Sequence, residues 1–269
     1  MRIVHRVSLH ATPEIVAALS AAGIPADTGL QTFEIAESDP RWPRVAELAD
    51  RLRAVDDVRT DFTVRECEQA PALQLVPGWH HGYPMPDDDG GYLDATYDLA
   101  EYCAVCGIGL RQTRPFRMAG EPRWGGRSIL QLHWIFDEFF VTPSLWRAAF
   151  EPAGIGARPV LDGRGARALS TVVQLDIPWL APVSELPSPG ASCASCGRCK
   201  HRPWTRGPFP PLDLEGRHAV RTEAWFGSGA SAWRAIVVSV DLYRRLRALK
   251  VRGADFVPVA ASSRCRAAS

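Results

Sequence analysis

The 269-residue sequence lacks an excess of charge of one sign and lacks any long hydrophobic run. It contains 31 Lys and Arg residues against 30 Asp and Glu residues, which gives a net charge of +1. No broad basic field would therefore attract nucleic acid or an anionic membrane. No stretch approaches the roughly 20 apolar residues of a membrane-spanning helix, and no apolar signal segment with a cleavage site follows Met1. We expect a cytoplasmic protein that does not bind a membrane.

The common sequence signatures of catalysis are also missing. No Ser or Cys stands in a nucleophile elbow or has a recognisable His partner. The segment 227–231, Gly-Ser-Gly-Ala-Ser, lacks the Lys and the following helix of a phosphate-binding loop, so we predict a hairpin loop there. Asp137 and Glu138 resemble a catalytic carboxylate pair, but a strand end before a capped helix accounts for them. The protein is therefore not expected to be an enzyme.

One loop remains as an alternative place for an unrecognised active site. It contains the adjacent residues His80 and His81 and the acidic run Asp87, Asp88 and Asp89. Adjacent His side chains tend to point in different directions, and an acidic run before two glycines is usually a solvated turn. The same loop, acidic and flanked by aromatic residues, could instead hold a basic partner.

What the sequence does contain is a pair of Cys-x-x-Cys-Gly elements. The first consists of Cys103, Cys106 and Gly107, and the second of Cys193, Cys196 and Gly197. Two thiolates three positions apart can bind one ion, and the glycine can adopt the positive φ that such a tight turn requires. Four thiolates complete a tetrahedral shell with no open position. We therefore predict one structural Zn²⁺ ion per chain.

The separation of the two elements does not exclude a shared site. Eighty-six residues lie between Cys106 and Cys193. Relative to a 15-residue loop, closing this longer one costs about 1.5 kcal/mol more, whereas structural zinc contributes about 10–16 kcal/mol of apparent binding free energy. The intervening residues also have strands and a helix of their own.

The ligand set leaves an alternative open, because Cys199 and His201 follow the second element closely and are reserve ligands. Three cysteines spaced by two residues also resemble part of an iron–sulfur motif, but a local fourth cysteine and its following proline are missing. Of the remaining cysteines, Cys67 is expected to be a core thiol and Cys265 a thiol of the tail.

Hydrophobic periodicity and capping residues predict an α+β fold with mixed or antiparallel sheets and a few flanking helices. Helices are expected at 13–22, at 43–55, from 143 onward and at 240–250. Strands are expected at 2–9, 30–35, 61–64, 73–76, 128–136, 158–161, 169–177, 219–226, 233–238 and 255–259. Loops are expected at 77–91 and 178–192. These elements suggest an N-terminal αβ segment at 1–90, a domain with both cysteine elements at 91–260, and a disordered tail at 261–269.

The two halves of the second domain have a weak internal similarity. Residues 141–146 resemble residues 238–243, and both stretches open a helix that is followed by a glycine and a short strand ending in Pro-Val. Each cysteine element may head a similar unit of strands and a helix, although chance similarity between such common patterns explains the observation equally well.

The paired Cys-x-x-Cys-Gly elements, about 90 residues apart, resemble the bacterial double-CXXCG-motif family. The similarity covers roughly residues 100–260 and includes Trp134 with Asp137-Glu138 and the stretch 225–229. Some members of that family are described as immunity proteins of a swapped-toxin system. The resemblance therefore implies that this protein binds and neutralises a cognate toxin protein. A zinc-ribbon-type nucleic-acid or regulatory module is an alternative, to which Lys200, His201 and Arg202 could contribute, although this basic patch is small.

Overall fold

The computed structural model describes residues 1–186 and 189–262. Contacts between residues divide the chain into two compact units. Unit 1 comprises Met1–Glu66 and Thr205–Gly207, and unit 2 comprises Cys67–Trp204 and the chain from Pro208 onward. The secondary structure is α+β, with mixed and antiparallel sheets and few helices, as the sequence predicts. Within the described part of the chain, no helix has both the length and the apolar composition of a bilayer-spanning segment.

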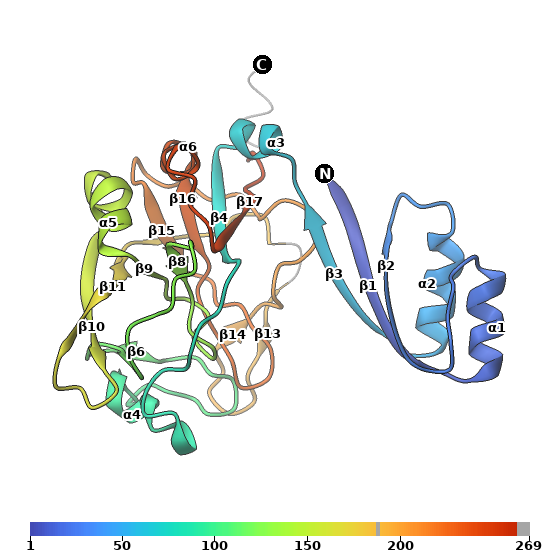
Figure 1. Ribbon diagram of the computed structural model, residues 1–269, viewed down its shortest axis with the longest axis horizontal. Coiled ribbons are helices and arrows are strands. Elements are labelled where there is room, and N and C mark those ends of the chain that lie inside the picture. Colours follow the sequence, from blue (N-terminus) through green and yellow to red (C-terminus); the bar gives the residue numbers. More distant parts are fainter. Residues whose placement is uncertain (187–188, 263–269) are drawn as a thin grey trace. The chain divides into compact units, whose positions relative to one another are not determined.

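Unit 1 is a three-stranded antiparallel sheet with two helices packed on one face (Figure 1). The strands have the order β2-β1-β3, and the elements are β1 (Arg2–Ala11), α1 (Pro13–Ala21), β2 (Gly29–Ala36), α2 (Trp42–Arg51) and β3 (Val55–Asp61). Alternation along β1 places Val7, Leu9 and Ala11 on one face, where they pack with Leu19 of α1 and Val45 of α2. Burial of this apolar face holds the helices on the sheet.

The ends of α1 lie where the sequence predicts them. The Thr12 side chain accepts a hydrogen bond from the amide of Ile15, Pro13 occupies the first turn, and Gly23 follows with a φ of +76°. Helix α2 ends earlier than the expected residue 55. Arg53, with a φ of +50°, turns the chain, and β3 begins at Val55.

The prediction of a strand at 61–64 is wrong. Strand β3 ends at Asp61, and helix α3 (Val64–Gln69) begins three residues later. Thr63 and Glu66 form a capping box. The Thr63 amide donates to the Glu66 carboxylate at 2.8 Å, and the Glu66 amide donates to the Thr63 hydroxyl at 3.3 Å. The Thr-x-x-Glu pattern of residues 63–66 is the sequence signature of this helix start.

Unit 2 contains two five-stranded sheets and two short strand pairs. The first sheet, in the order β7-β10-β11-β9-β8, consists of β7 (Arg117–Met118), β8 (Ile129–Leu130), β9 (Phe140–Val141), β10 (Gly156–Asp162) and β11 (Ala168–Asp176). The second, in the order β12-β15-β16-β4-β17, consists of β4 (Ala72–Pro77), β12 (Leu180–Ala181), β15 (Ala219–Thr222), β16 (Ile236–Ser239) and β17 (Ala254–Pro258). The pairs are β5 (Tyr97–Asp98) with β6 (Arg111–Gln112), and β13 (Ala191–Ser192) with β14 (Cys199–Lys200).

The helices of unit 2 are short. They are α4 (Tyr92–Thr96), α5 (Pro143–Leu145), which continues into a π turn at Trp146–Phe150, and α6 (Val240–Ala248), with single 3₁₀ turns at Asp88–Gly90 and Glu151–Ala153. Both helices of the possible repeat begin as expected. The Thr142 hydroxyl accepts a hydrogen bond from the Leu145 amide, and the Ser239 hydroxyl accepts one from the Leu242 amide. The two helices differ in length and form, and whether they are repeats stays a hypothesis.

The observed division of the chain differs from the boundary expected after residue 90. Strand β4 pairs with β16 on one side and β17 on the other, as Figure 1 shows. A strand near residue 75 therefore completes a sheet built from the last third of the chain. Its apolar sequence predicts a strand but does not specify the partner, because the pairing joins residues about 160 positions apart. Residues 263–269 of the expected tail lie outside the described residues.

The strand expected at 128–136 is present only as β8. Trp134 has a φ of +69°, which interrupts any extended run, and the segment instead bonds to the loop at 77–91. The His81 amide donates to the Gln131 carbonyl oxygen, the Gln131 amide to the Trp79 carbonyl oxygen, and the His133 amide to the Gly82 carbonyl oxygen. The expected loop is thus anchored along part of its length.

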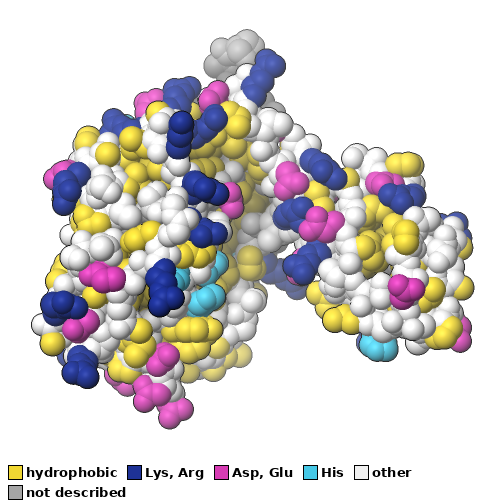
Figure 2. Space-filling model, viewed as in Figure 1, with side chains coloured by type: hydrophobic (Ala, Val, Ile, Leu, Met, Phe, Trp, Pro, Cys, Tyr) yellow, Lys and Arg dark blue, Asp and Glu magenta, His cyan; other side chains and the backbone are white. Residues whose placement is uncertain are grey.

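The surface of unit 2 has no large region of one charge on the face that Figure 2 presents. Lys and Arg side chains are scattered there among acidic and hydrophobic ones. This distribution agrees with the net charge of +1.

Candidate functional site

The two Cys-x-x-Cys-Gly elements meet in unit 2, although they lie 90 positions apart in the sequence. The sulfur atoms of Cys103, Cys106, Cys193 and Cys196 all lie within 4.8 Å of one another. The Cys103 and Cys193 sulfurs are 3.9 Å apart, and the Cys106 and Cys196 sulfurs are 3.6 Å apart. No disulfide forms among these residues, since a disulfide sulfur–sulfur bond is only about 2.05 Å long.

The two turns have the same backbone hydrogen bonds. In the first, the Gly107 amide donates to the Cys103 carbonyl oxygen at 2.7 Å, and the Cys103 amide donates to the Ile108 carbonyl oxygen at 2.9 Å. In the second, the Gly197 amide donates to the Cys193 carbonyl oxygen at 2.8 Å, and the Cys193 amide donates to the Arg198 carbonyl oxygen at 2.9 Å. Gly107 and Gly197 have φ values of +81° and +72°. The positive φ expected from the motif is confirmed at both positions.

The geometry of the four sulfurs fits a bound metal ion. Sulfurs at the corners of a tetrahedron with metal–sulfur bonds of about 2.3 Å lie about 3.8 Å apart, and the Cys103–Cys193 and Cys106–Cys196 distances fall on either side of that value. Cys103 and Cys106 are buried and pack with Ile108, so bulk water is largely excluded. Four sulfurs would fill the coordination sphere, which is typical of a structural site.

Backbone amides and one arginine affect the acidity of these thiols. Hydrogen bonds from the amides of Cys106 and Val105 lower the pKa of Cys103. The Arg198 side chain lowers the pKa of Cys196 to about 6, its Nε lying 3.4 Å from the sulfur. Burial raises the pKa of Cys106 to about 11. Thiolates are the form that binds metal, so a bound cation is what would stabilise the buried Cys106 thiolate.

Two basic residues join the second turn to its surroundings. Arg198 donates to the Glu101 carbonyl oxygen at 2.7 Å. The Lys200 ammonium donates to three carbonyl oxygens at 2.7–2.9 Å, those of Cys106, Gly229 and Ser231. Lys200 therefore holds the first turn and the 227–231 loop together. That loop is a hairpin, as predicted, with Phe226 and Trp233 paired across it.

The reserve ligands lie outside the four-sulfur group. Cys199 is exposed on β14, where its sulfur lies 3.2 Å from the Ser192 hydroxyl, and His201 forms a β-bridge with Phe226. The metal-binding group found among the described residues contains neither of them. Cys67 is buried, as expected of a core thiol, whereas Cys265 lies outside the described residues.

The alternative site around His80, His81 and Asp87–Asp89 does not assemble into a metal-binding group in the described part of the chain. His80 stacks on His133 with ring centroids 5.5 Å apart, and His81 contacts Trp79 at 5.1 Å. Burial lowers the pKa of both His80 and His81. The three aspartates are exposed around a 3₁₀ turn.

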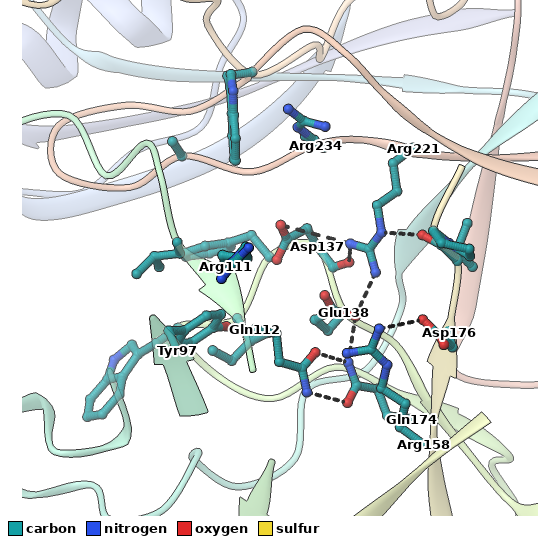
Figure 3. A pocket seen from close by; sticks show the side chains of 18 of the residues that line it. Tyr97, Arg111, Gln112, Asp137, Glu138, Arg158, Gln174, Asp176, Arg221 and Arg234 are labelled. Atoms are coloured by element: carbon teal, nitrogen blue, oxygen red, sulfur yellow. Dashed lines mark hydrogen bonds and ion pairs between the residues drawn. The ribbon is translucent and has the colours of Figure 1, made fainter. Parts of the chain in front are cut away.

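Unit 2 contains a cavity of about 540 Å³ that is lined by several charged side chains (Figure 3). No function was expected for these residues from the sequence. Asp137 and Glu138 point into the cavity, and the Arg221 side chain of β15 points toward them. Arg221 donates to the Glu138 carboxylate at 2.8 Å and to the backbone oxygens of Asp137 and Ile177 at 2.6 and 2.8 Å. The Gln174 amide also donates to Glu138, at 2.9 Å. The strand-end explanation of Asp137-Glu138 therefore missed a buried polar network.

Within this network, burial disfavours the charged form of the Asp137 carboxyl. Burial and, second, the neighbouring Glu138 carboxylate raise the pKa of Asp137 to about 6, against an ordinary value of 3.8. Its contact with Arg221 is longer, at 4.0 Å, than that of Glu138. A carboxyl with a raised pKa in a cavity is a frequent mark of a functional site. The sequence offered one signal for it, an acidic pair beside aromatic residues, but not the distant Arg221.

The cysteine cluster and the cavity share a wall. Trp225 and Ala232 pack against the cysteine cluster and also line the cavity. Gly107 allows this approach, because a Cβ atom there would overlap the Ala230 carbonyl oxygen and lie only 2.7 Å from the Ala232 amide nitrogen.

In comparisons with known proteins, no family model, no curated protein and no solved structure matches this chain.

The two motif glycines form a matched pair for mutation. Gly197→Ala meets no atom within 4 Å, so it should lower the free energy of unfolding by only about 1 kcal/mol, the cost of a left-handed Ala. Gly107→Ala adds an overlap with backbone that cannot move aside, and should cost about 3 kcal/mol or more. Urea unfolding of both variants measures the difference. Equal losses would contradict the close packing of the 230–232 segment on the first turn.

Replacing Asp137 should affect stability in a pH-dependent way. Because the folded-state pKa is above the unfolded value, protonation stabilises the fold below about pH 4, and this contribution is lost as the pH rises through about 6. Asp137→Asn should therefore be more stable than the wild type at pH 8, by on the order of 1 kcal/mol, with a smaller gain at pH 5.

Asp176→Asn is the matched control, since it loses the 2.8 Å ion pair with Arg158 in the same cavity and should gain no stability at pH 8. Urea unfolding at both pH values measures the comparison. An Asp137→Asn variant that is less stable at pH 8 would show that the carboxylate is stabilising.

Proposed function

We propose that this protein is a cytoplasmic immunity protein that binds and neutralises a cognate toxin protein, and that a structural zinc ion holds its binding unit together. The class of partner comes from the resemblance to the double-CXXCG-motif family. The two elements that define the resemblance form one four-sulfur cluster with matching turns. A saturated metal centre provides rigidity rather than chemistry, which suits a protein that acts by binding.

Zinc is the ion that best fits the donor set. Four thiolates in a tetrahedral arrangement select zinc or iron among the common metals. A single closed site that joins two distant turns needs no redox function, and zinc has none. Four cysteine sulfurs would occupy all four positions of a tetrahedral shell and leave none open for a substrate.

The observation that supports partner binding most directly is an exposed aromatic surface on unit 2. Tyr83, Trp134 and Phe136 are 42%, 47% and 40% exposed, and they are the aromatic side chains among the exposed large hydrophobic residues of the described chain. Tyr83 and Trp134 are in ring contact at 4.5 Å, and Phe136 packs on Trp233 at 4.9 Å. Clustered, rigid aromatic side chains are typical hot spots of protein interfaces.

The alternative functions receive less support from the described residues. Lys200, part of the small basic patch, donates hydrogen bonds from its ammonium group to three carbonyl oxygens of the protein, and these bonds occupy its three N–H donors. The proposed His and Asp set around residues 80–89 does not converge on a metal-binding group in the described chain. An immunity function requires neither feature.

The metal assignment predicts one zinc ion per chain in the purified protein, measured by elemental analysis. Cys106→Ser should lose the zinc and become strongly destabilised, because a buried ligand is removed. Cys199→Ser is the matched control and should keep both zinc and stability, since Cys199 is exposed and outside the cluster. Iron in the protein, or a stable Cys106→Ser variant without metal, would contradict the assignment.

The partner assignment predicts that the product of the adjacent gene is a toxin and copurifies with this protein when both are expressed. Trp134→Ala should weaken that complex at least about 10-fold, as expected for an aromatic hot spot. Leu249→Ala, which truncates a comparably exposed apolar residue on the same unit, should leave the affinity unchanged. Cells that express the toxin and gain no protection from this protein would refute the proposal.

A further inference from the structure

The cavity beside the cysteine cluster has the size and the walls of a small-molecule site. Its volume of about 540 Å³ lies within the range of about 300–1,000 Å³ for ligand pockets. Tyr97, Trp134 and Phe136 supply flat apolar surface, and Trp225 adds a further ring beside the cluster. Such walls suit a ligand with a planar, mainly apolar body.

Most of the charged side chains of the cavity are already paired within the protein. Arg221 binds Glu138 at 2.8 Å, Arg158 binds Asp176 at 2.8 Å, and Arg111 binds Asp98 at 3.1 Å. The first of these pairs is largely buried, whereas the other two are partly exposed. These three arginines therefore have a carboxylate within the protein to offset their charge.

Arg234 differs from the other arginines of the cavity. Its guanidinium carbon lies 4.6 Å from the ring centroid of Trp225, and its Nε is buried without a hydrogen-bond partner among the described residues. Within that part of the chain, no carboxylate lies in ion-pair contact with it. Burial and, second, the positive charge of Arg221 lower the pKa of Arg234. The carboxylates of Asp137 and Glu223 raise the pKa of Arg234 but only partly offset these two effects. A bound anion would therefore stabilise the guanidinium.

The total charge of the lining agrees with an anionic ligand. Four arginines and three carboxylates line the cavity, and the carboxyl of Asp137 gains a proton more readily than an ordinary aspartate. Figure 3 places Arg234 beyond Asp137 and next to Arg221, on the side of the cavity away from the Arg158–Asp176 pair. Arg234 and Arg221 therefore bring two guanidinium groups to this side of the cavity, where Asp137 lies between them.

We propose that this cavity binds a small anionic molecule with a flat, largely apolar body, and that Arg234 holds its carboxylate or phosphate group. Trp225 orients Arg234 by stacking, and the cysteine cluster fixes Trp225 from behind. The apolar body of the ligand lies along the aromatic walls. Trp134 and Phe136 line this cavity and also belong to the aromatic surface proposed to bind the toxin, so the two sites adjoin. The small-molecule proposal depends on Arg234 and does not require the toxin-binding function.

Binding of benzoate and of phenyl phosphate to the full-length protein tests the proposal and separates the two anionic groups. Ligand-observed NMR titration should give saturable binding of at least one of them, with a Kd on the order of 1 mM. Benzamide, which has the same ring without the charge, should bind at least about 10-fold more weakly. Inorganic phosphate alone shows whether the anionic group suffices without the ring.

Three variants distinguish a binding role from a structural one. Arg234→Gln should weaken anion binding at least about 10-fold, whereas Asp137→Asn should tighten it, because a nearby negative charge is removed. A merely structural disturbance would weaken binding in both. Arg217→Gln is the matched control, since Arg217 also lies over a tryptophan, Trp179 at 5.9 Å, but outside the cavity.

Several results would overturn the proposal. They are the absence of saturable binding of either anion, equal binding of benzamide and benzoate, and unchanged anion binding in a folded Arg234→Gln variant. If neither small anion binds but Arg234→Gln weakens the toxin complex, the cavity belongs to the protein interface and the small-molecule site is rejected.

Discussion

The four-sulfur cluster is the constraint on which the arrangement of unit 2 depends. It joins residues 103–107 to residues 193–197, two turns that are far apart in the sequence and too short to be stable alone. Arg198 and Lys200 extend the connection by donating to carbonyl oxygens of the first turn and its neighbours. A metal bound only in the folded state adds its binding free energy to the stability of the fold. The cluster therefore stabilises contacts that the modest local elements could not maintain.

The cluster also determines the shape of the cavity beside it. Ala232 and Trp225 form a layer between the sulfurs and the cavity, and the layer approaches the first turn closely because residue 107 has no side chain. Arg234 rests on Trp225. The possible metal site and the proposed anion site therefore share Trp225 and Ala232, and no cysteine of the cluster lines the cavity.

The sequence predicts local features well and long-range pairings poorly. The cysteine turns, their glycines, the Thr12 cap and the Gly227–Ser231 hairpin depend on residues within a few positions of one another, and the structure confirms them. The division of the chain differs because β4 pairs with strands about 160 residues later, and periodicity alone contains no information on partners. The cavity was missed for the same reason, since Arg221 is 83 positions from Glu138. Trp134 disrupts an expected strand through a positive φ that its residue type disfavours.

The arrangement of the four cysteine sulfurs leads us to propose that one metal ion bound by them holds unit 2 together. X-ray absorption at the zinc edge of the purified protein tests it most directly, because the fine structure reports the identity, number and distance of the ligands. We expect four sulfur neighbours at about 2.3 Å and no nitrogen or oxygen neighbours. A site with nitrogen or oxygen ligands, or a protein that contains no zinc and is folded, would contradict it.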